Sequence, residues 1–134
     1  MAITYTLEPD LSAQEFRDVL VSSTLAERRP VDDIARLEKM LRHADIIVTA
    51  RDGIKLVGIA RAVTDFSYCC YLSDLAVDTA YQHKGIGRRL IEETQKAAGP
   101  QTGVHLIAAP KAEGYYPKIG MRHVPSCWGY PRAA

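Results

Sequence analysis

Apolar and polar positions alternate along the first third of the chain in two different periods. Residues 3–7 alternate strictly, which predicts a short strand. Ser12 and Glu15 then form the S-x-x-E pattern of a capping box, so a helix is expected to begin there. A second helix is expected to follow, with Asp32 or Asp33 as its cap. Both helices are expected to cover a sheet with an apolar face. This face consists of Phe16, Val19 and Leu20 in the first helix and of Ile34, Leu37 and Leu41 in the second.

Isoleucine and valine are concentrated in two stretches near the middle of the chain, residues 45–51 and 54–63. Asp52-Gly53 lies between them, and this dipeptide is typical of a tight β-hairpin turn. The pattern predicts an antiparallel pair of strands. A third strand is expected over residues 68–77, which would extend the pair to a three-stranded meander.

The last part of the chain returns to helical spacing. Residues 88–98 have the pattern of an amphipathic helix, and residues 104–109 read as another strand, parallel to the third through a right-handed crossover. A short helix over residues 111–119 and an extended stretch from Arg122 complete the order. The sequence therefore predicts an α/β protein with a mixed sheet flanked by helices.

Composition narrows the class of protein. The 134 residues suit a single domain spanning 1–134, and 17 Lys and Arg against 16 Asp and Glu leave no broad field that favours nucleic acid or an anionic membrane. Three cysteines without paired spacing, and an N-terminus without a signal pattern, favour a soluble cytoplasmic protein with free thiols. The four histidines show no spacing typical of a metal site, so no metal is expected.

The segment Gln82-His83-Lys84-Gly85-Ile86-Gly87, called the glycine turn below, joins the third strand to the helix that follows. Glycines allow torsions and close approaches that other residues resist, and a helix N-terminus offers unpaired N–H groups to an anion. A dinucleotide-binding fingerprint would have a third small residue where Leu90 stands, and a P-loop would have Lys-Ser/Thr where Arg88-Arg89 stands. The turn therefore predicts a phosphate site of another kind.

Two motifs together resemble the GCN5-related N-acetyltransferase (GNAT) family. They are the glycine turn after Leu75-Ala76-Val77-Asp78, with the pattern Q-x-x-G-x-G, and the later segment Tyr115-Tyr116-Pro117-Lys118-Ile119-Gly120. The resemblance covers nearly the whole chain and implies the family's acyl-CoA N-acyltransferase fold, a splayed and mainly antiparallel sheet. Residues 57–62 and 128–132 are most similar to the branch that includes plant and cyanobacterial serotonin N-acetyltransferase-like proteins.

The resemblance implies acetyl-coenzyme A (acetyl-CoA) as co-substrate. Its pantetheine arm would lie between the strands 68–77 and 104–109, bonded to the backbone of the first of them, and its pyrophosphate would lie on the glycine turn, with Arg88 or Lys84 adding charge. The residues expected to bind the co-substrate are Leu75, Ala76, Val77, Gln82, His83, Lys84, Gly85, Ile86, Gly87 and Arg88.

The same resemblance supplies two catalytic candidates. Tyr116 is expected near the thioester sulfur, where it would donate a proton to the departing thiolate; the alternative is a ring packed in the core. Asp74 is the candidate general base that helps the amine to react, and its alternative is a carboxylate paired within the structure. If the acceptor lies on the other side of the strand, Tyr71 or Ser73 would serve through water instead.

The resemblance implies an N-acetyltransferase that moves the acetyl group from acetyl-CoA to the primary amine of a small molecule by direct attack in a ternary complex. A non-catalytic acyl-CoA binding or sensing domain is the main alternative. A partner-binding subunit is a third, because Cys127–Tyr130 is aromatic and could meet another protomer in a homodimer. Arg28-Arg29-Pro30 is either a solvated loop or a border of the acceptor site.

Overall fold

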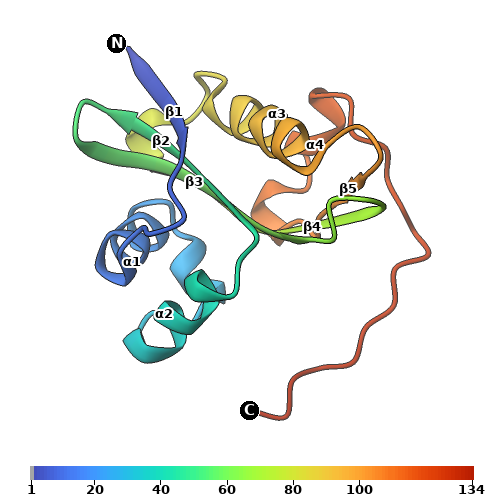
Figure 1. Cartoon of the computed structure of the whole chain (residues 1–134), viewed down its shortest axis with the longest axis horizontal. Coiled ribbons are helices and arrows are strands. Elements are labelled where there is room, and N and C mark those ends of the chain that lie inside the picture. Colours follow the sequence, from blue (N-terminus) through green and yellow to red (C-terminus); the bar gives the residue numbers. More distant parts are fainter. Residues whose placement is uncertain (1) are drawn as a thin grey trace.

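A computed structural model describes residues 2–134 and shows a five-stranded sheet with helices on both faces (Figure 1). The strands follow one another across the sheet in chain order. They are β1 (Ile3–Leu7), β2 (Ile46–Asp52), β3 (Lys55–Thr64), β4 (Cys69–Val77) and β5 (Gly103–His105). The α-helices are α1 (Ala13–Ser22), α2 (Ile34–Arg42), α3 (Ile86–Ala98) and α4 (Tyr115–Lys118), and the 3-10 helices are η1 (Leu25–Arg28), η2 (Thr79–Tyr81) and η3 (Pro110–Ala112).

Strands β1 to β4 pair antiparallel, and β5 joins β4 in parallel, so the predicted mixed sheet is confirmed. Gly53 makes the expected hairpin turn with φ +62, a torsion that glycine adopts without strain. The pairing of β3 with β4 shifts by one residue, because Arg61 faces Asp74 while Ala62 faces Leu72. Ser73 is therefore the extra residue of a β-bulge in β4.

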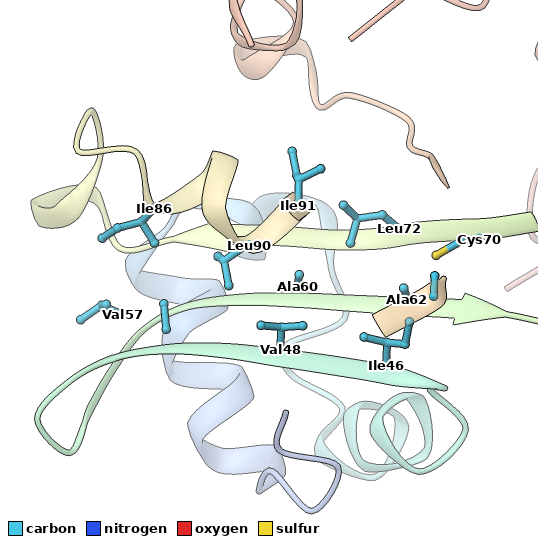
Figure 2. Close-up of a cluster of buried hydrophobic side chains, with 12 residues drawn as sticks. Ile46, Val48, Val57, Ala60, Ala62, Cys70, Leu72, Ile86, Leu90 and Ile91 are labelled. Atoms are coloured by element: carbon cyan, nitrogen blue, oxygen red, sulfur yellow. The ribbon is translucent and has the colours of Figure 1, made fainter. Parts of the chain in front are cut away.

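Alternating side chains divide the sheet into two apolar layers. On one face, α1 and α2 pack with Phe16, Leu20 and Leu37 against Ile59 and its neighbours. On the other face α3 covers the sheet, and Figure 2 shows its apolar side chains above the strands, where they meet those of the sheet. The labelled residues of this second cluster are Ile46, Val48, Val57, Ala60, Ala62, Cys70, Leu72, Ile86, Leu90 and Ile91.

The predicted helix starts are confirmed with one change. Ser12 accepts a hydrogen bond from the Glu15 backbone N–H at 3.1 Å, and Asp33 caps α2 through the Arg36 N–H. The Glu15 carboxylate, however, bonds Arg51 on β2 at 2.8 Å. This ion pair ties α1 to the sheet, because a guanidinium offers a carboxylate stronger bonds than a backbone amide does.

Two predicted elements are shorter than the pattern indicated. The strand expected over residues 104–109 is wrong in length, because β5 ends at His105. It pairs with β4 only as far as Tyr71, next to the bulge at Ser73 that bends β4 away. The helix expected over residues 111–119 is split into η3 and α4 around Gly114, since glycine weakens a helix interior.

The C-terminal segment runs away from the body of the molecule (Figure 1). Residues 122–134 are exposed and contain no strand, so the expected extended stretch does not join the sheet. Trp128 and Tyr130 are exposed over more than nine tenths of their surface. That they contact another protomer remains a prediction.

Three further findings concern the described residues. The cysteines Cys69, Cys70 and Cys127 are free thiols. No helix between residues 2 and 134 is both long enough and apolar enough to cross a membrane. In the same range, no three His, Cys, Asp or Glu side chains gather in a way that could hold a metal ion.

Candidate active site

A pocket of about 1420 Å³ opens where the sheet splits between β4 and the chain after β5. Beyond Tyr71, β4 has no strand on its outer side, and its residues Ser73–Val77 line one wall, apart from the buried Asp74. Leu106, Ile107 and Ala109, which follow β5, line the opposite wall. The pocket reaches the η1–α2 loop on one face of the sheet and the start of α3 on the other.

Nine of the ten residues expected to bind the co-substrate line this pocket, and Lys84 is the exception. Of the two cations considered for the phosphates, Arg88 therefore lies at the pocket and Lys84 does not. Gln82 donates from its side-chain amide to the Val77 carbonyl at 3.0 Å, so one backbone group of β4 is already bonded. The structure brings β4 and the glycine turn together as the sequence predicts.

The glycine turn enters α3 through two residues with positive φ, His83 at +64 and Gly85 at +82. The first bond of the helix runs from the Arg89 N–H to the Gly85 carbonyl at 3.1 Å. The N–H groups of Ile86 and Gly87 lie in the first turn of α3 and therefore have no acceptor within the helix. Gly85 has no side chain that could accept from them as a cap. Such a helix start suits the negative charge of a pyrophosphate.

The two glycines of the turn are needed for different reasons. Gly85 adopts its torsion with no atom within 4 Å of a β-carbon placed on it. Gly87 does not have a positive φ, but a β-carbon there would lie 2.9 Å from the Tyr115 hydroxyl oxygen. Burial raises the pKa of Tyr115, and the Arg88 backbone N–H opposes this shift by donating to the phenol oxygen. Tyr115 thus lies at the α3 N-terminus, a position that the sequence did not indicate.

Tyr116 lines the pocket and packs partly against the cluster under α3. Its ring meets that of Tyr115 edge to face, with 5.4 Å between the centroids. Burial raises the pKa of Tyr116 above its ordinary value of 10, and the neighbouring Tyr115 adds to the shift. The hydroxyl therefore keeps its proton at neutral pH and can donate it.

Asp74 is fully buried, and one arginine holds each of its carboxylate oxygens. Arg61 comes from the paired position on β3, and Arg29 comes from the loop after η1. Asp74 does not line the pocket. This geometry favours the alternative of a carboxylate paired within the structure over the role of general base.

Arg61 is a residue of this network that the sequence reasoning missed. Its side chain is 9% exposed, and it also donates to the Ser73 hydroxyl at 3.0 Å and to the Met40 carbonyl at 3.3 Å. A signal was present, since an arginine within the apolar stretch 54–63 requires a buried acidic partner. Arg28 and Arg29 both line the pocket. That their loop borders the acceptor site stays a prediction.

A five-stranded mixed sheet that splits beside a bulged strand, with a glycine turn at the split, defines an acyl-CoA N-acyltransferase architecture. The family described as acetyltransferase (GNAT) domain matches residues 8–126. The chain therefore belongs to the GCN5-related N-acetyltransferase family.

The chain resembles one curated relative from a plant. GCN5-related N-acetyltransferase 2, chloroplastic, from Arabidopsis thaliana is 30% identical over 73 residues, which are 53% of this chain and 28% of that relative. The chain thus matches less than a third of the relative's length. The narrower similarity to the serotonin N-acetyltransferase branch stays a prediction.

Solved structures share the fold over almost the full chain. A protein of unknown function from meticillin-resistant Staphylococcus aureus has a TM-score of 0.80 at 22% identity, covering 99% of this chain and 100% of its own. A GNAT family acetyltransferase from Streptococcus pneumoniae has a TM-score of 0.74 at 23% identity, covering 99% and 98%. An aminoglycoside N-acetyltransferase in complex with CoA has a TM-score of 0.74 at 16% identity, covering 99% and 96%. At these identities the likeness confirms the fold.

Proposed function

We propose that this chain is a single acetyl-CoA-dependent N-acetyltransferase domain that acetylates the primary amine of a small molecule by direct attack in a ternary complex. The observation that carries the proposal is the continuous pocket, which joins the glycine turn on the α3 face to the η1–α2 loop on the other face. Tyr116 lies on its wall. Two substrates entering from opposite faces would meet beside β4.

The residues of the glycine turn suit the pyrophosphate of acetyl-CoA. The start of α3 offers N–H groups without helical acceptors, and Arg88 adds a positive charge at the pocket. The chain's likeness to an aminoglycoside N-acetyltransferase solved with CoA supports this placement. So does the structure of that enzyme with a bisubstrate analogue that contains CoA and an acetylneamine.

The reaction would proceed as an acyl transfer. The free amine attacks the carbonyl carbon of the thioester, a nitrogen–carbon bond forms, and the carbon–sulfur bond breaks. The sulfur leaves as a thiolate, to which the Tyr116 hydroxyl supplies a proton. The amine nitrogen loses one proton, so the products are an amide and free CoA. A backbone N–H near Ala76, on the edge of β4 that is not paired with β3, is the candidate donor to the oxygen that becomes negative during attack.

An alkylamine has a pKa of about 10.4, so on the order of one molecule in a thousand is neutral at pH 7. A group at the acceptor side must therefore accept a proton. Ser73 and Tyr71 line the pocket, and either can relay it through water. Asp74, held by Arg29 and Arg61, would act on this step by fixing the position of those arginines.

Release of free thiol from acetyl-CoA, measured with a panel of primary amines, tests this proposal. Amine-dependent release at a rate well above hydrolysis is the expected result. If no amine in a broad panel gives release while calorimetry shows that acetyl-CoA binds, the chain is a sensing domain and the enzyme proposal is wrong.

A further inference from the structure

The part of the pocket outside the glycine turn and α3, where the proposed function places the amine, is called the acceptor half below. It is strongly cationic. The described residues that line it outside the glycine turn and α3 include six arginine or lysine side chains and one acidic side chain, Glu27. The six are Arg28, Arg29, Arg36, Arg61, Lys111 and Arg132. An unoccupied wall of this charge repels a purely cationic substrate.

The carboxylates near this wall are already paired. Glu27 bonds Lys111 at 3.0 Å, an ion pair that joins η1 to η3. Asp74 lies behind the wall and pairs with both Arg29 and Arg61, so a single negative charge is shared by two guanidinium groups. Neither carboxylate is left to receive the ammonium group of a second amine.

Arg29 has a fixed guanidinium with donors to spare. Its Nε bonds Asp74, Nη1 donates to the Arg28 carbonyl at 2.8 Å, and Nη2 donates to the Ser73 carbonyl at 2.7 Å. These bonds use one N–H at each nitrogen, and an arginine side chain has five. The side chain is 21% exposed and lines the pocket, so the remaining N–H groups are available to a ligand there.

Arg28 and Arg36 stand beside it on η1 and α2. Both are exposed, both line the pocket, and neither side chain forms an ion pair within residues 2–134. The site proposed for the co-substrate phosphates is at the start of α3, which packs on the opposite face of the sheet. The arginines of the η1–α2 loop therefore have no assigned anion.

We infer that the acceptor carries an anionic group, a carboxylate or a phosphate, close to the amine that is acetylated, and that Arg28, Arg29 and Arg36 bind this group. The inference rests on the proposed acetyl transfer and narrows its substrate class. Guanidinium groups bind carboxylate and phosphate oxygens through charge-assisted hydrogen bonds. An anion held at this loop would direct the amine of the same molecule toward Ser73 and the split in the sheet.

Matched pairs of acceptors test the inference by thiol release. Phosphoethanolamine is compared with ethanolamine, and β-alanine with β-alaninamide, so the members of each pair differ in the anionic group. The pair with the larger ratio of kcat/KM between its two members shows whether the site prefers a phosphate or a carboxylate. The anionic member is expected to have a kcat/KM at least about tenfold higher. Arg28→Gln and Arg36→Gln are each expected to raise the KM for the anionic member about tenfold, with the acetyl-CoA Kd unchanged. Lys39→Gln, an exposed cation on α2 that does not line the pocket, is the control.

Each outcome decides between the two proposals. Equal or better turnover of ethanolamine and β-alaninamide, which lack the anionic group, overturns the inference and leaves the acetyltransferase proposal intact. A higher Kd for acetyl-CoA in Arg28→Gln and Arg36→Gln also overturns it, because the arginines then bind the co-substrate. If no acceptor is acetylated, calorimetry with CoA-loaded protein decides: selective binding of phosphoethanolamine or β-alanine that both variants lose supports the anion site, and absence of selective binding overturns it.

Discussion

Gly87 and Tyr115 meet across the first turn of α3, where a β-carbon on residue 87 would lie 2.9 Å from the phenol oxygen. This contact joins the glycine turn to α4, the helix that also carries Tyr116. The placement of the proposed proton donor therefore depends on the absence of a side chain at residue 87.

Gly87→Ala is expected to displace Tyr115 and to raise the Kd for acetyl-CoA about tenfold, since overpacking of this kind costs roughly 1 to 3 kcal/mol. Isothermal titration calorimetry measures the change. Gly114→Ala is the control, because its φ of −72 suits alanine and a β-carbon there meets nothing within 4 Å. An unaltered Kd in Gly87→Ala would show that the contact does not matter for binding.

Asp74→Asn is expected to lower the free energy of unfolding by about 3 kcal/mol, because it removes the buried charge that neutralises two arginines. Urea unfolding followed by circular dichroism measures the loss. Asp32→Asn, at an exposed position, is the control. An unchanged free energy of unfolding in Asp74→Asn would contradict the structural role of the buried carboxylate.

The Glu8 carboxylate connects β1 to Arg51 on β2 through bonds of 2.8 and 2.9 Å, and it also bonds Thr49. The Arg51 hydrogen bonds lower the pKa of Glu8 below its ordinary value of 4.5, against the opposing effect of burial. A carboxyl whose pKa is lower in the folded state stabilises the fold above its unfolded pKa, and this contribution is lost as the pH falls through the folded pKa.

Glu8→Gln is therefore expected to reduce the free energy of unfolding by about 2 kcal/mol at pH 7, and the difference from wild type should shrink as the pH falls below about 4.5. Urea titrations at several pH values measure it. Glu38→Gln, which breaks an exposed pair with Arg42, is the control and should change stability by less than about 1 kcal/mol. A difference that persists at pH 3 would contradict the assigned ionisation.

Much of the fold can be predicted from local pattern. The S-x-x-E start of α1, the Asp52-Gly53 turn and the period of α3 are signals carried by neighbouring residues, and all three are confirmed. The length of β5 has no such signal. It is decided by the bulge at Ser73, which depends on the register between β3 and β4.

Part of the site can also be predicted from local sequence, and part cannot. The glycine turn and Tyr116 are predictable because a motif in consecutive residues marks them. The pairing of Asp74 with Arg29 joins residues 45 positions apart, and the contact of Gly87 with Tyr115 depends on how α4 packs against α3. Such relationships arise from tertiary packing, so a single sequence contains no local trace of them.

The pH dependence of turnover tests the proposed role of Tyr116. Because burial raises its pKa above 10, the hydroxyl holds its proton throughout the range from pH 7 to 9.5. With saturating substrates, kcat is therefore expected not to fall on the alkaline side of that range. A decline centred below pH 9 would mean that another group donates the proton.

The most direct test of the account is the turnover of Tyr116→Phe with saturating acetyl-CoA and the best amine of the panel. The change removes only the hydroxyl, and Tyr130→Phe in the exposed C-terminal segment is the control. Loss of a general acid is expected to lower kcat by about 10²- to 10⁴-fold, while the acetyl-CoA Kd stays within about threefold of wild type. A Tyr116→Phe variant with the turnover of wild type would contradict the mechanism.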